Sequence, residues 1–260
     1  MFQIRYLGWL LVLLCLHACV PAGQPAAEKR AQQADVHYKL GVSHLQANNP
    51  TRALKELLIA VENGPKNPAI HASLAQAYQL KKAYSLAEKH YLQALNLSDN
   101  DPRYQNNLAS LYLDMQQWDK AIDYFGKAAS NLLFLNPHIA LTGKGYAYFK
   151  KQDYPAAIQQ FDEVAVIAPR YVQAYYYQSE TYQAMGEDEL ARNALQKAVD
   201  LAPGFLQAGY ELGVMLMKDE QREAARTRFE QIVEFSPESE WGVRAAKMLD
   251  ALPVAESESK

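Results

Sequence analysis

Two cysteines, Cys15 and Cys19, are the residues of this 260-residue chain with the most specific chemistry. Cysteines this close together could form a disulfide, hold a metal or carry a covalent group. They end a short apolar run, Leu7 to Leu16, which follows a start with one positive charge, Arg5. A bilayer-spanning helix needs about 20 apolar residues, so the run is too short to span. A charged start, a short apolar core and a small residue before the break are typical of a secretory signal peptide.

The residues 16–19, Leu-His-Ala-Cys, resemble a bacterial lipobox, with a leucine three before the cysteine and a small residue directly before it. His17 departs from the pattern, which usually has a small or hydroxyl residue there. The resemblance implies a lipoprotein signal peptide over 1–18 and lipid such as palmitate on Cys19, the mature N-terminus. The alternative is an ordinary signal peptide that is cut later, for instance after Ala22.

Cleavage before Cys19 discards Cys15, so a disulfide or a metal site between them is not expected. The residue after the lipidated cysteine is Val20. It is not the aspartate that retains many lipoproteins at the inner membrane. We therefore predict a lipid anchor in the outer membrane, on its periplasmic face.

Histidines are the next candidates for chemistry, but their spacing does not favour a metal site. His37 and His44 are seven residues apart, a helical rise of about 10 Å, which is too far for one metal ion. They occupy the repeat positions of His71, Tyr78 and Tyr112, which indicates core aromatic positions. No metalloprotease, serine-hydrolase or phosphate-loop motif occurs.

The charge balance bears on the possible partners. The chain has 26 basic and 29 acidic side chains, a formal charge of −3, which gives no overall attraction to nucleic acid phosphates. We therefore expect no nucleic acid partner. The absence of the catalytic and metal-binding motifs leads us to expect no catalytic residues, no metal, no cofactor and no small-molecule substrate. The chain is predicted to bind proteins and not to be an enzyme.

The elements that would position a binding site emerge from an internal repeat. One alanine recurs at gaps of 34, 34, 36, 34 and 34 residues: Ala53, Ala87, Ala121, Ala157, Ala191 and Ala225. A large residue follows each alanine by four positions: Leu57, Tyr91, Phe125, Phe161, Leu195 and Phe229. A small residue precedes each alanine by twelve: Gly41, Ala75, Ala109, Gly145, Ser179 and Gly213. This is the 34-residue tetratricopeptide pattern of paired helices.

Because one helix pair cannot bury its apolar face alone, neighbouring pairs stack. The sequence predicts an all-α, right-handed superhelical solenoid of six tetratricopeptide repeats with a C-terminal capping helix. The predicted repeats are 34–67, 68–101, 102–135, 138–171, 172–205 and 206–239. A tether over 19–33 precedes them, and a capping helix over 240–252 and a disordered tail over 253–260 follow them.

The stretch 106–161 resembles one family of repeat proteins. The Asn106-Asn107 pair, the helix with "AIDYF" and the extended turn that ends in Asn136-Pro137 are similar to the type IV pilus biogenesis and stability lipoproteins. These are the pilotins (the PilF/PilW/Tgl group), which accompany an outer-membrane secretin. Family members often have cysteines near Leu113 and Tyr146, so the resemblance implies that a disulfide there is lost.

Tetratricopeptide proteins line their concave surface with the second, fifth, ninth and twelfth positions of each repeat. Exposed apolar residues on such a wall indicate a partner site. The predicted partner-binding residues are Tyr38, Leu45, Arg103, Asn106, Ser110, Leu113, Ile139, Thr142, Tyr146, Phe149, Tyr176 and Tyr210. Some of them could instead pack between helices. The lysine and asparagine set that clamps a chain terminus in some relatives is missing, which favours an extended or helical partner segment.

The resemblance implies an outer-membrane lipoprotein that binds the secretin of the type IV pilus, promotes its localisation and assembly into multimers, and supports pilus-dependent motility. Its partners would be secretin subunits, and the outer membrane through the lipid. The alternative is a general periplasmic scaffold lipoprotein that recruits peptidoglycan enzymes or outer-membrane assembly factors.

Overall fold

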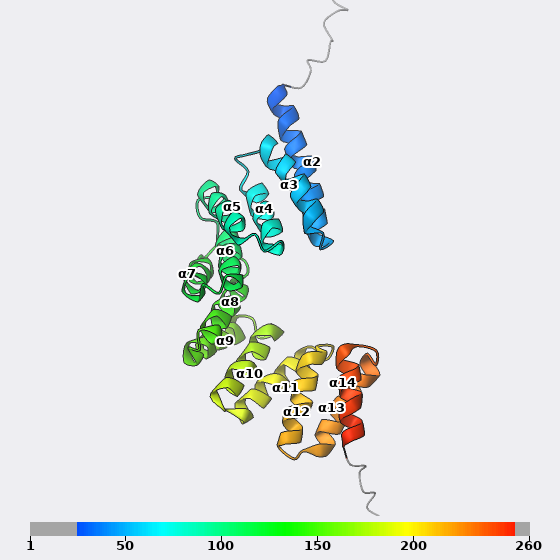
Figure 1. Ribbon diagram of the computed structural model, residues 1–260. Helices are drawn as coiled ribbons and strands as arrows, with labels where there is room; N and C mark the ends of the chain where they lie inside the picture. The colour runs from blue at the N-terminus through cyan, green and yellow to red at the C-terminus, as the bar shows by residue number, and fades with distance from the viewer. Residues whose placement is uncertain (1–24, 253–260) are drawn as a thin grey trace, which may run out of the picture. The chain divides into compact units, whose positions relative to one another are not determined.

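The computed structural model describes residues 25–252, which form thirteen α-helices and no strand (Figure 1). The helices are α2 (Ala26–Gln46), α3 (Pro50–Asn63), α4 (Pro68–Leu80), α5 (Tyr84–Leu97), α6 (Pro102–Asp114), α7 (Trp118–Ala129), α8 (Pro137–Lys150), α9 (Tyr154–Ile167), α10 (Val172–Met185), α11 (Asp188–Leu201), α12 (Leu206–Lys218), α13 (Arg222–Phe235) and α14 (Glu240–Ala251). The predicted all-α class and the helix-pair repeats are confirmed. The predicted signal peptide, the lipidation site Cys19 and the tail over 253–260 lie outside the described residues.

The chain divides into two compact units, one ending at Leu97 and the other beginning at Ser98. The first unit contains α2 to α5, in which α2 packs on α3 and α4 packs on α5. The second unit contains α6 to α14, in which each odd-numbered helix from α7 to α13 packs on the helix before it.

The helix pairs are held together by the small and large residues of the repeat. All six recurring alanines are fully buried. A Cβ on Gly145 would lie only 2.6 Å from Cε1 of Phe161, and one on Gly213 would lie 2.6 Å from Cε1 of Phe229. Cores of this density have no space for even one added carbon. The small residue of the first helix thus allows the large ring of the second helix to reach it.

The turn between the two helices of each repeat contains one residue in the left-handed region. These residues are Asn48, Lys82, Gln116, Gln152, Gly186 and Glu220, with φ between 51° and 79°. A left-handed residue after the last helical turn redirects the chain into the second helix. Only the fifth turn uses glycine, so the other five turns carry the steric cost of a Cβ there.

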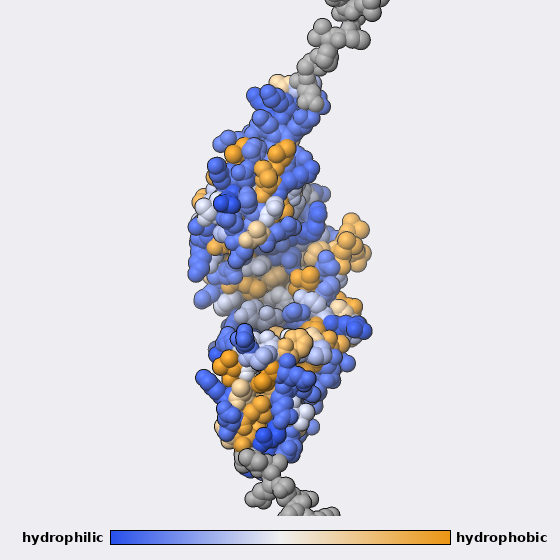
Figure 2. All heavy atoms as spheres, turned by 90° about the vertical axis from the view of Figure 1, so that its right-hand side faces the viewer, coloured by the Kyte–Doolittle hydropathy of each residue, from blue (hydrophilic) through white to orange (hydrophobic). Residues whose placement is uncertain are grey.

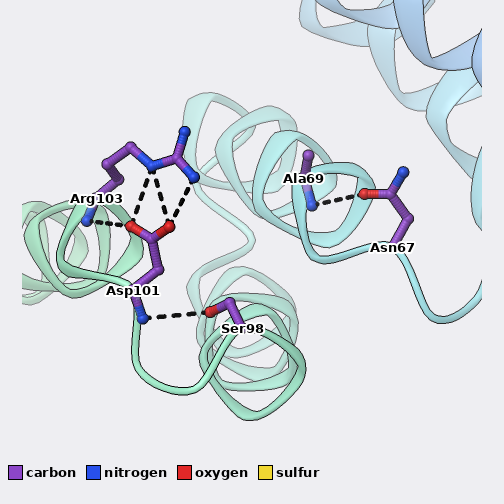
Figure 3. Close-up of polar contacts among 5 residues, drawn as sticks. All are labelled: Asn67, Ala69, Ser98, Asp101 and Arg103. Carbon is purple, nitrogen blue, oxygen red and sulfur yellow. Dashed lines mark hydrogen bonds and ion pairs between the residues drawn. The ribbon is translucent and has the colours of Figure 1, made fainter.

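Several helices have a proline at their first or second position, directly after a polar capping residue or one residue beyond it. Asn67 accepts a hydrogen bond from the backbone N of Ala69 at the start of α4, and Figure 3 shows this cap. Asp153 caps α9 by accepting from the backbone N of Ala156. Proline suits the first helical positions because its missing N–H would be unpaired there.

The first helix is longer than the sequence predicted. The tether was predicted over 19–33, but α2 begins at Ala26. The segment 26–33 consists of Ala, Glu, Lys, Arg and Gln, which all favour helices, and all of its residues are exposed. The tether prediction was therefore wrong for these residues.

The last helix covers the end of the second unit. α14 packs on α12 and α13, and its Ala245 is fully buried. Trp241 and Met248 of α14 pack against the core that Leu212 and Phe229 form. Terminal repeats of a solenoid need such a cover because their outer face has no next repeat.

Candidate functional site

The predicted binding residues of the first unit are largely packing residues. Tyr38 and Leu45 of α2 are half-buried. Both rest against a core that includes Leu57 of α3 and Leu74 of α4. Their side chains therefore contribute to the contact between helices of this unit.

On α6 of the second unit, Arg103 is tied to the start of its own helix. Its backbone N donates to Oδ1 of Asp101 at 2.8 Å, and its guanidinium donates to Oδ2 of Asp101 at 2.6 Å (Figure 3). Hydrogen bonds from the Arg103 side chain lower the pKa of Asp101 although partial burial opposes this. Arg103 thus stabilises the cap of α6 as well as lying at the surface.

The other predicted residues of α6 differ in exposure. Ser110 is exposed, whereas Asn106 and Leu113 are half-buried. The side-chain oxygen of Asn106 is buried and has no hydrogen-bond partner among the described residues. Of these three residues, only Ser110 is freely accessible to a partner.

The predicted residues of α8 fall into two groups. Thr142 is buried, and its hydroxyl donates to the carbonyl of His138 at 2.8 Å, so this hydroxyl is satisfied within its own helix and does not line a surface. Ile139 is exposed, and Tyr146 and Phe149 are half-buried. The two rings lie together, with centroids 6.1 Å apart.

These rings continue onto α10 and form what we name the aromatic surface: Tyr146 and Phe149 of α8 with Tyr176 and Tyr177 of α10. Tyr176 was predicted to line the groove, but it is only 8% exposed and is part of a buried core. The Tyr146 and Tyr177 centroids are 4.9 Å apart, and those of Tyr176 and Tyr177 are 5.8 Å apart. Such offset and tilted pairs are the favoured geometries of aromatic rings. The aromatic surface therefore joins the first helices of two successive repeats.

A polar network borders the aromatic surface on the side of α12. The Tyr176 hydroxyl donates to Oε1 of Glu211 at 3.0 Å and accepts from Nε2 of Gln207 at 2.7 Å. Gln207 also donates to Oε1 of Glu211 at 3.0 Å. Burial, and after it the carboxylates of Glu180 and Glu211, raise the pKa of Tyr176, so its hydroxyl stays a donor.

Charged groups lie on the aromatic surface itself. Nζ of Lys150 is 5.0 Å from the ring centroid of Tyr146 and 5.4 Å from that of Phe149. Burial, and then the Glu211 carboxylate, raise the pKa of Glu180, while Lys150 lowers it in part. The aromatic surface is thus both apolar and acidic, with one ammonium group beside it.

The predicted residue Tyr210 of α12 is half-buried and belongs to a different contact. Its ring lies 5.5 Å from that of Trp241 and 5.7 Å from that of Phe229, between centroids. Tyr210 therefore anchors the capping helix α14 and is not one of the rings of the aromatic surface.

A second apolar feature lies in the loop between α7 and α8, which we name the leucine loop (residues 131–136). Leu132 is fully exposed, and Leu133 and Leu135 are almost fully exposed. The loop borders a hollow of about 620 Å³ that also includes Asp101 and Arg103. On the face of the molecule drawn in Figure 2, apolar patches lie among hydrophilic residues. Exposed apolar side chains such as those of the leucine loop are therefore available to a partner.

Another hollow, of about 560 Å³, lies along α11 and α13 and is bordered by Arg228, Gln231 and Phe235. Burial lowers the pKa of Arg228, and Asp200 opposes this. None of the predicted binding residues contributes to this hollow.

Over residues 25–252, no group of three or more histidine, cysteine, aspartate or glutamate side chains could hold a metal ion. Within the same range, each helix is either too short or too polar to traverse a bilayer.

Sequence reasoning missed four residues at the aromatic surface: Tyr177, Lys150, Gln207 and Glu211. Tyr177 and Glu211 both follow the fifth position of their repeats by one residue. One helical step of about 100° turns such a side chain toward the preceding repeat, where Tyr177 meets Tyr146 and Glu211 meets the Tyr176 hydroxyl. The run Tyr175-Tyr176-Tyr177 was the signal that could have indicated them.

A tetratricopeptide repeat family model matches residues 38–104 and 106–172, and a second tetratricopeptide repeat model matches 172–205. The chain belongs to the tetratricopeptide repeat family, whose members are typically protein-interaction modules. Among curated proteins it is similar to the Hsp70-Hsp90 organizing protein of Triticum aestivum, at 26% identity over 166 residues, 60% of this chain and 27% of that protein. The chain thus spans about a quarter of the length of that relative.

Two solved structures share this fold over nearly their whole length. Pseudomonas aeruginosa PilF matches with a TM-score of 0.68 and 18% identity, covering 85% of this chain and 99% of that one. PilW, described as a widely conserved type IV pilus biogenesis factor, matches with a TM-score of 0.69 and 20% identity, covering 82% of this chain and 98% of that one. At such identities the likeness shows the shared fold.

Proposed function

We propose that this chain is an outer-membrane lipoprotein, anchored by lipid on Cys19, that binds secretin subunits of the type IV pilus machine. By binding them it promotes their localisation at the outer membrane and their assembly into multimers, and so supports pilus biogenesis and motility. It acts without catalysis and without a cofactor.

One observation carries the proposal. The fold match covers 99% of PilF and 98% of PilW, a type IV pilus biogenesis factor, so the similarity of fold extends over nearly the whole of both proteins. The resemblance of residues 106–161 to the pilotin family and the lipobox at Cys19 support the same assignment from the sequence side.

The aromatic surface is the binding site that we propose. Aromatic residues are enriched among interface residues that dominate binding energy, because a ring buries a large area with few rotatable bonds. Tyr146 and Phe149 are half-buried, so part of each ring is accessible to a partner. An extended or helical segment of the secretin would lie along this face.

The test compares heat-resistant secretin multimers in cells that carry different versions of the gene. We expect the multimers to be lost in a strain without the gene and in a strain with Tyr146→Ala/Phe149→Ala, with the variant present at its normal level. Phe235→Ala is the matched control because this exposed ring lies on α13, away from the aromatic surface. Normal multimers with the double variant would place the binding surface elsewhere.

The strain without the gene separates the two function classes. If that strain assembles normal secretin multimers, the pilotin function is wrong. The general scaffold lipoprotein, which recruits peptidoglycan enzymes or outer-membrane assembly factors, would then be favoured.

The anchor has its own test. Cys19→Ser should abolish labelling with a palmitate analogue and release the protein into the soluble periplasmic fraction, because the acylated cysteine supplies the membrane attachment. A variant that is labelled as strongly as the wild-type protein would contradict the lipidation of Cys19.

A further inference from the structure

We infer that the aromatic surface selects a partner segment with a basic side chain, which lies between Glu180 and Glu211 while its apolar neighbours contact Tyr146 and Phe149. The inference rests on the proposed function in that it takes the same surface as the binding site. It adds the chemistry of the partner: an apolar segment that carries arginine, or lysine.

The first reason is that the aromatic surface already accommodates a cation of the chain itself. The Lys150 ammonium lies over the rings of Tyr146 and Phe149, at 5.0 and 5.4 Å from their centroids. A cation is attracted to the face of an aromatic ring by the ring quadrupole. The faces of these rings are therefore suited to a positively charged group, and Tyr177 packs beside them.

The second reason is the set of acceptors next to these rings. Glu211 and the Tyr176 hydroxyl both accept an N–H of Gln207, at 3.0 and 2.7 Å. The chain thus places the amide N–H group of Gln207 against these two oxygens. They are therefore positioned to accept hydrogen bonds from N–H donors. An incoming guanidinium or ammonium would offer the same donors with a full charge.

The third reason is that one carboxylate on this surface has no counterpart. Glu180 is half-buried, and among the described residues its carboxylate has no hydrogen-bond or ion-pair partner. The charged groups that act on it are Glu211 and Lys150. Since Lys150 is directed at the rings, two carboxylates share one ammonium group, and the balance is negative.

Partial burial strengthens the effect of this excess negative charge on a bound cation. Between half-buried groups the effective dielectric constant is lower than in water, so an opposite charge at this position gains more than on an open surface. Burial and the Glu211 carboxylate raise the pKa of Glu180, which reports the same unfavourable crowding of negative charge. A cation relieves that crowding, whereas an acidic or terminal carboxylate would increase it.

Arginine fits the surface better than lysine. Its planar guanidinium has five N–H donors, stacks on aromatic faces and is less strongly hydrated than an ammonium group. It would stack on the half-buried ring of Tyr177 while donating to carboxylates of α10 and α12. Lysine would provide charge with a less specific geometry.

The experiment selects peptides from a random twelve-residue display library on the mature, full-length protein. We expect the wild-type protein to enrich apolar peptides in which arginine or lysine is several-fold more frequent than in the starting library. Selection on Glu180→Gln/Glu211→Gln should lose the basic residue and retain the apolar ones. Glu163→Gln/Glu230→Gln is the matched control, because both glutamates are exposed on second helices, α9 and α13.

An enriched arginine peptide then gives the quantitative test. Replacing its arginine by citrulline, which is uncharged and nearly the same shape, should weaken binding by about tenfold, the usual effect of losing a charge-assisted hydrogen bond. With Glu180→Gln/Glu211→Gln the two peptides should bind equally. Melting curves should show that this variant is folded, since glutamine preserves the shape of glutamate.

Three results would overturn the inference: no enrichment of any peptide, enrichment without basic residues, or equal binding of the arginine and citrulline peptides by the wild-type protein. Each of them leaves the secretin assignment untouched, because the multimer assay in cells tests that separately. Conversely, normal secretin multimers in the strain without the gene would refute the secretin assignment without affecting the peptide result.

Discussion

Two clusters of rings, one in each unit, illustrate how the same residue type can serve stability or binding. In the first unit, His71 and Tyr78 of α4 stack on the ring of His90 of α5, with centroids 5.3 and 5.6 Å apart. In the second unit, the aromatic surface runs from α8 to α10. The first cluster lies within one repeat, and the second joins two successive repeats.

The two clusters differ in how their polar atoms are used. His71 is buried, with Nε2 at 2.9 Å from the carbonyl of Pro65 and Nδ1 at 3.0 Å from Nδ1 of His90. Because a carbonyl only accepts, Nε2 of His71 donates, so Nδ1 of His71 accepts from His90. Both nitrogens of His71 are thus satisfied internally, whereas the aromatic surface leaves Glu180 without a counterpart. The first cluster is therefore structural, and the second is suited to a partner.

The largest expected effect concerns the packing that both units share. Ala121→Trp should destabilise the protein by about 3 kcal/mol or more, because a fully buried alanine site cannot admit an indole without displacing neighbouring helices. Chemical denaturation followed by far-ultraviolet circular dichroism measures it. Ala184→Trp is the control, since Ala184 of α10 is exposed. Equal stability of the two variants would show that the assigned register of the third repeat is wrong.

The histidine cluster predicts that the stability of the first unit depends on pH. Burial, and then the nearby His71 and Lys89, lower the pKa of His90 to about 4. The folded state thus disfavours the protonated ring, so the stabilisation is complete above the unfolded pKa of about 6.5 and is lost as the pH falls from 6.5 toward 4. Because His90 is half-exposed, screening reduces the loss to about 1–2 kcal/mol.

The measurement is the free energy of unfolding at pH 7.5 and at pH 4.5, for the wild-type protein and for His90→Gln. Subtracting the variant removes the contribution of the carboxylates, which also titrate in this range. The wild-type protein should lose more stability than the variant. If both lose the same amount, folding does not lower the pKa of His90.

A smaller effect is expected from the turns, which should behave alike in the two units. Lys82 in the first unit and Gln152 in the second have φ of 58° and 66°. Replacing either by glycine should stabilise by about 0.5–1 kcal/mol, because glycine adopts this conformation without a Cβ clash. Gly186→Ala should destabilise by a similar amount. Opposite signs for Lys82→Gly and Gln152→Gly in thermal unfolding would contradict the shared turn geometry.

The smallest effect is expected at the leucine loop. Leu132→Ser should change the free energy of unfolding by less than about 0.5 kcal/mol, because the side chain is fully exposed. Leu141→Ser, on the following helix α8, is the matched control and should cost about 3 kcal/mol, since Leu141 is buried. A substantial loss with Leu132→Ser would mean that the leucine loop packs against the fold.

The sequence was sufficient to predict the class of fold. The regular spacing of Ala53 and its five counterparts reflects the packing of paired helices, since each of these alanines is fully buried in the structure. Two features were not predictable in this way. The start of α2 at Ala26 depends on helix propensity without an apolar pattern, and the division at Leu97 depends on contacts that no single repeat encodes.

The binding surface was predictable only in part. Tyr146, Phe149 and Tyr176 follow from counting positions along each first helix. The role of Glu211 does not, because its hydrogen bond comes from Tyr176, 35 residues earlier in the chain. Thr142 was misplaced because its hydroxyl bonds to its own helix backbone, an option that position counting does not consider.

The measurement that tests the central claim most directly is co-purification of the secretin with the tagged, full-length protein from detergent-solubilised envelope. The secretin should co-purify with the wild-type protein and with Phe235→Ala. It should be largely lost with Tyr146→Ala/Phe149→Ala, because removing two central aromatic contacts costs about 2–4 kcal/mol of binding. A double variant that is folded and retains the secretin at the wild-type level would contradict the claim that the aromatic surface is the binding site.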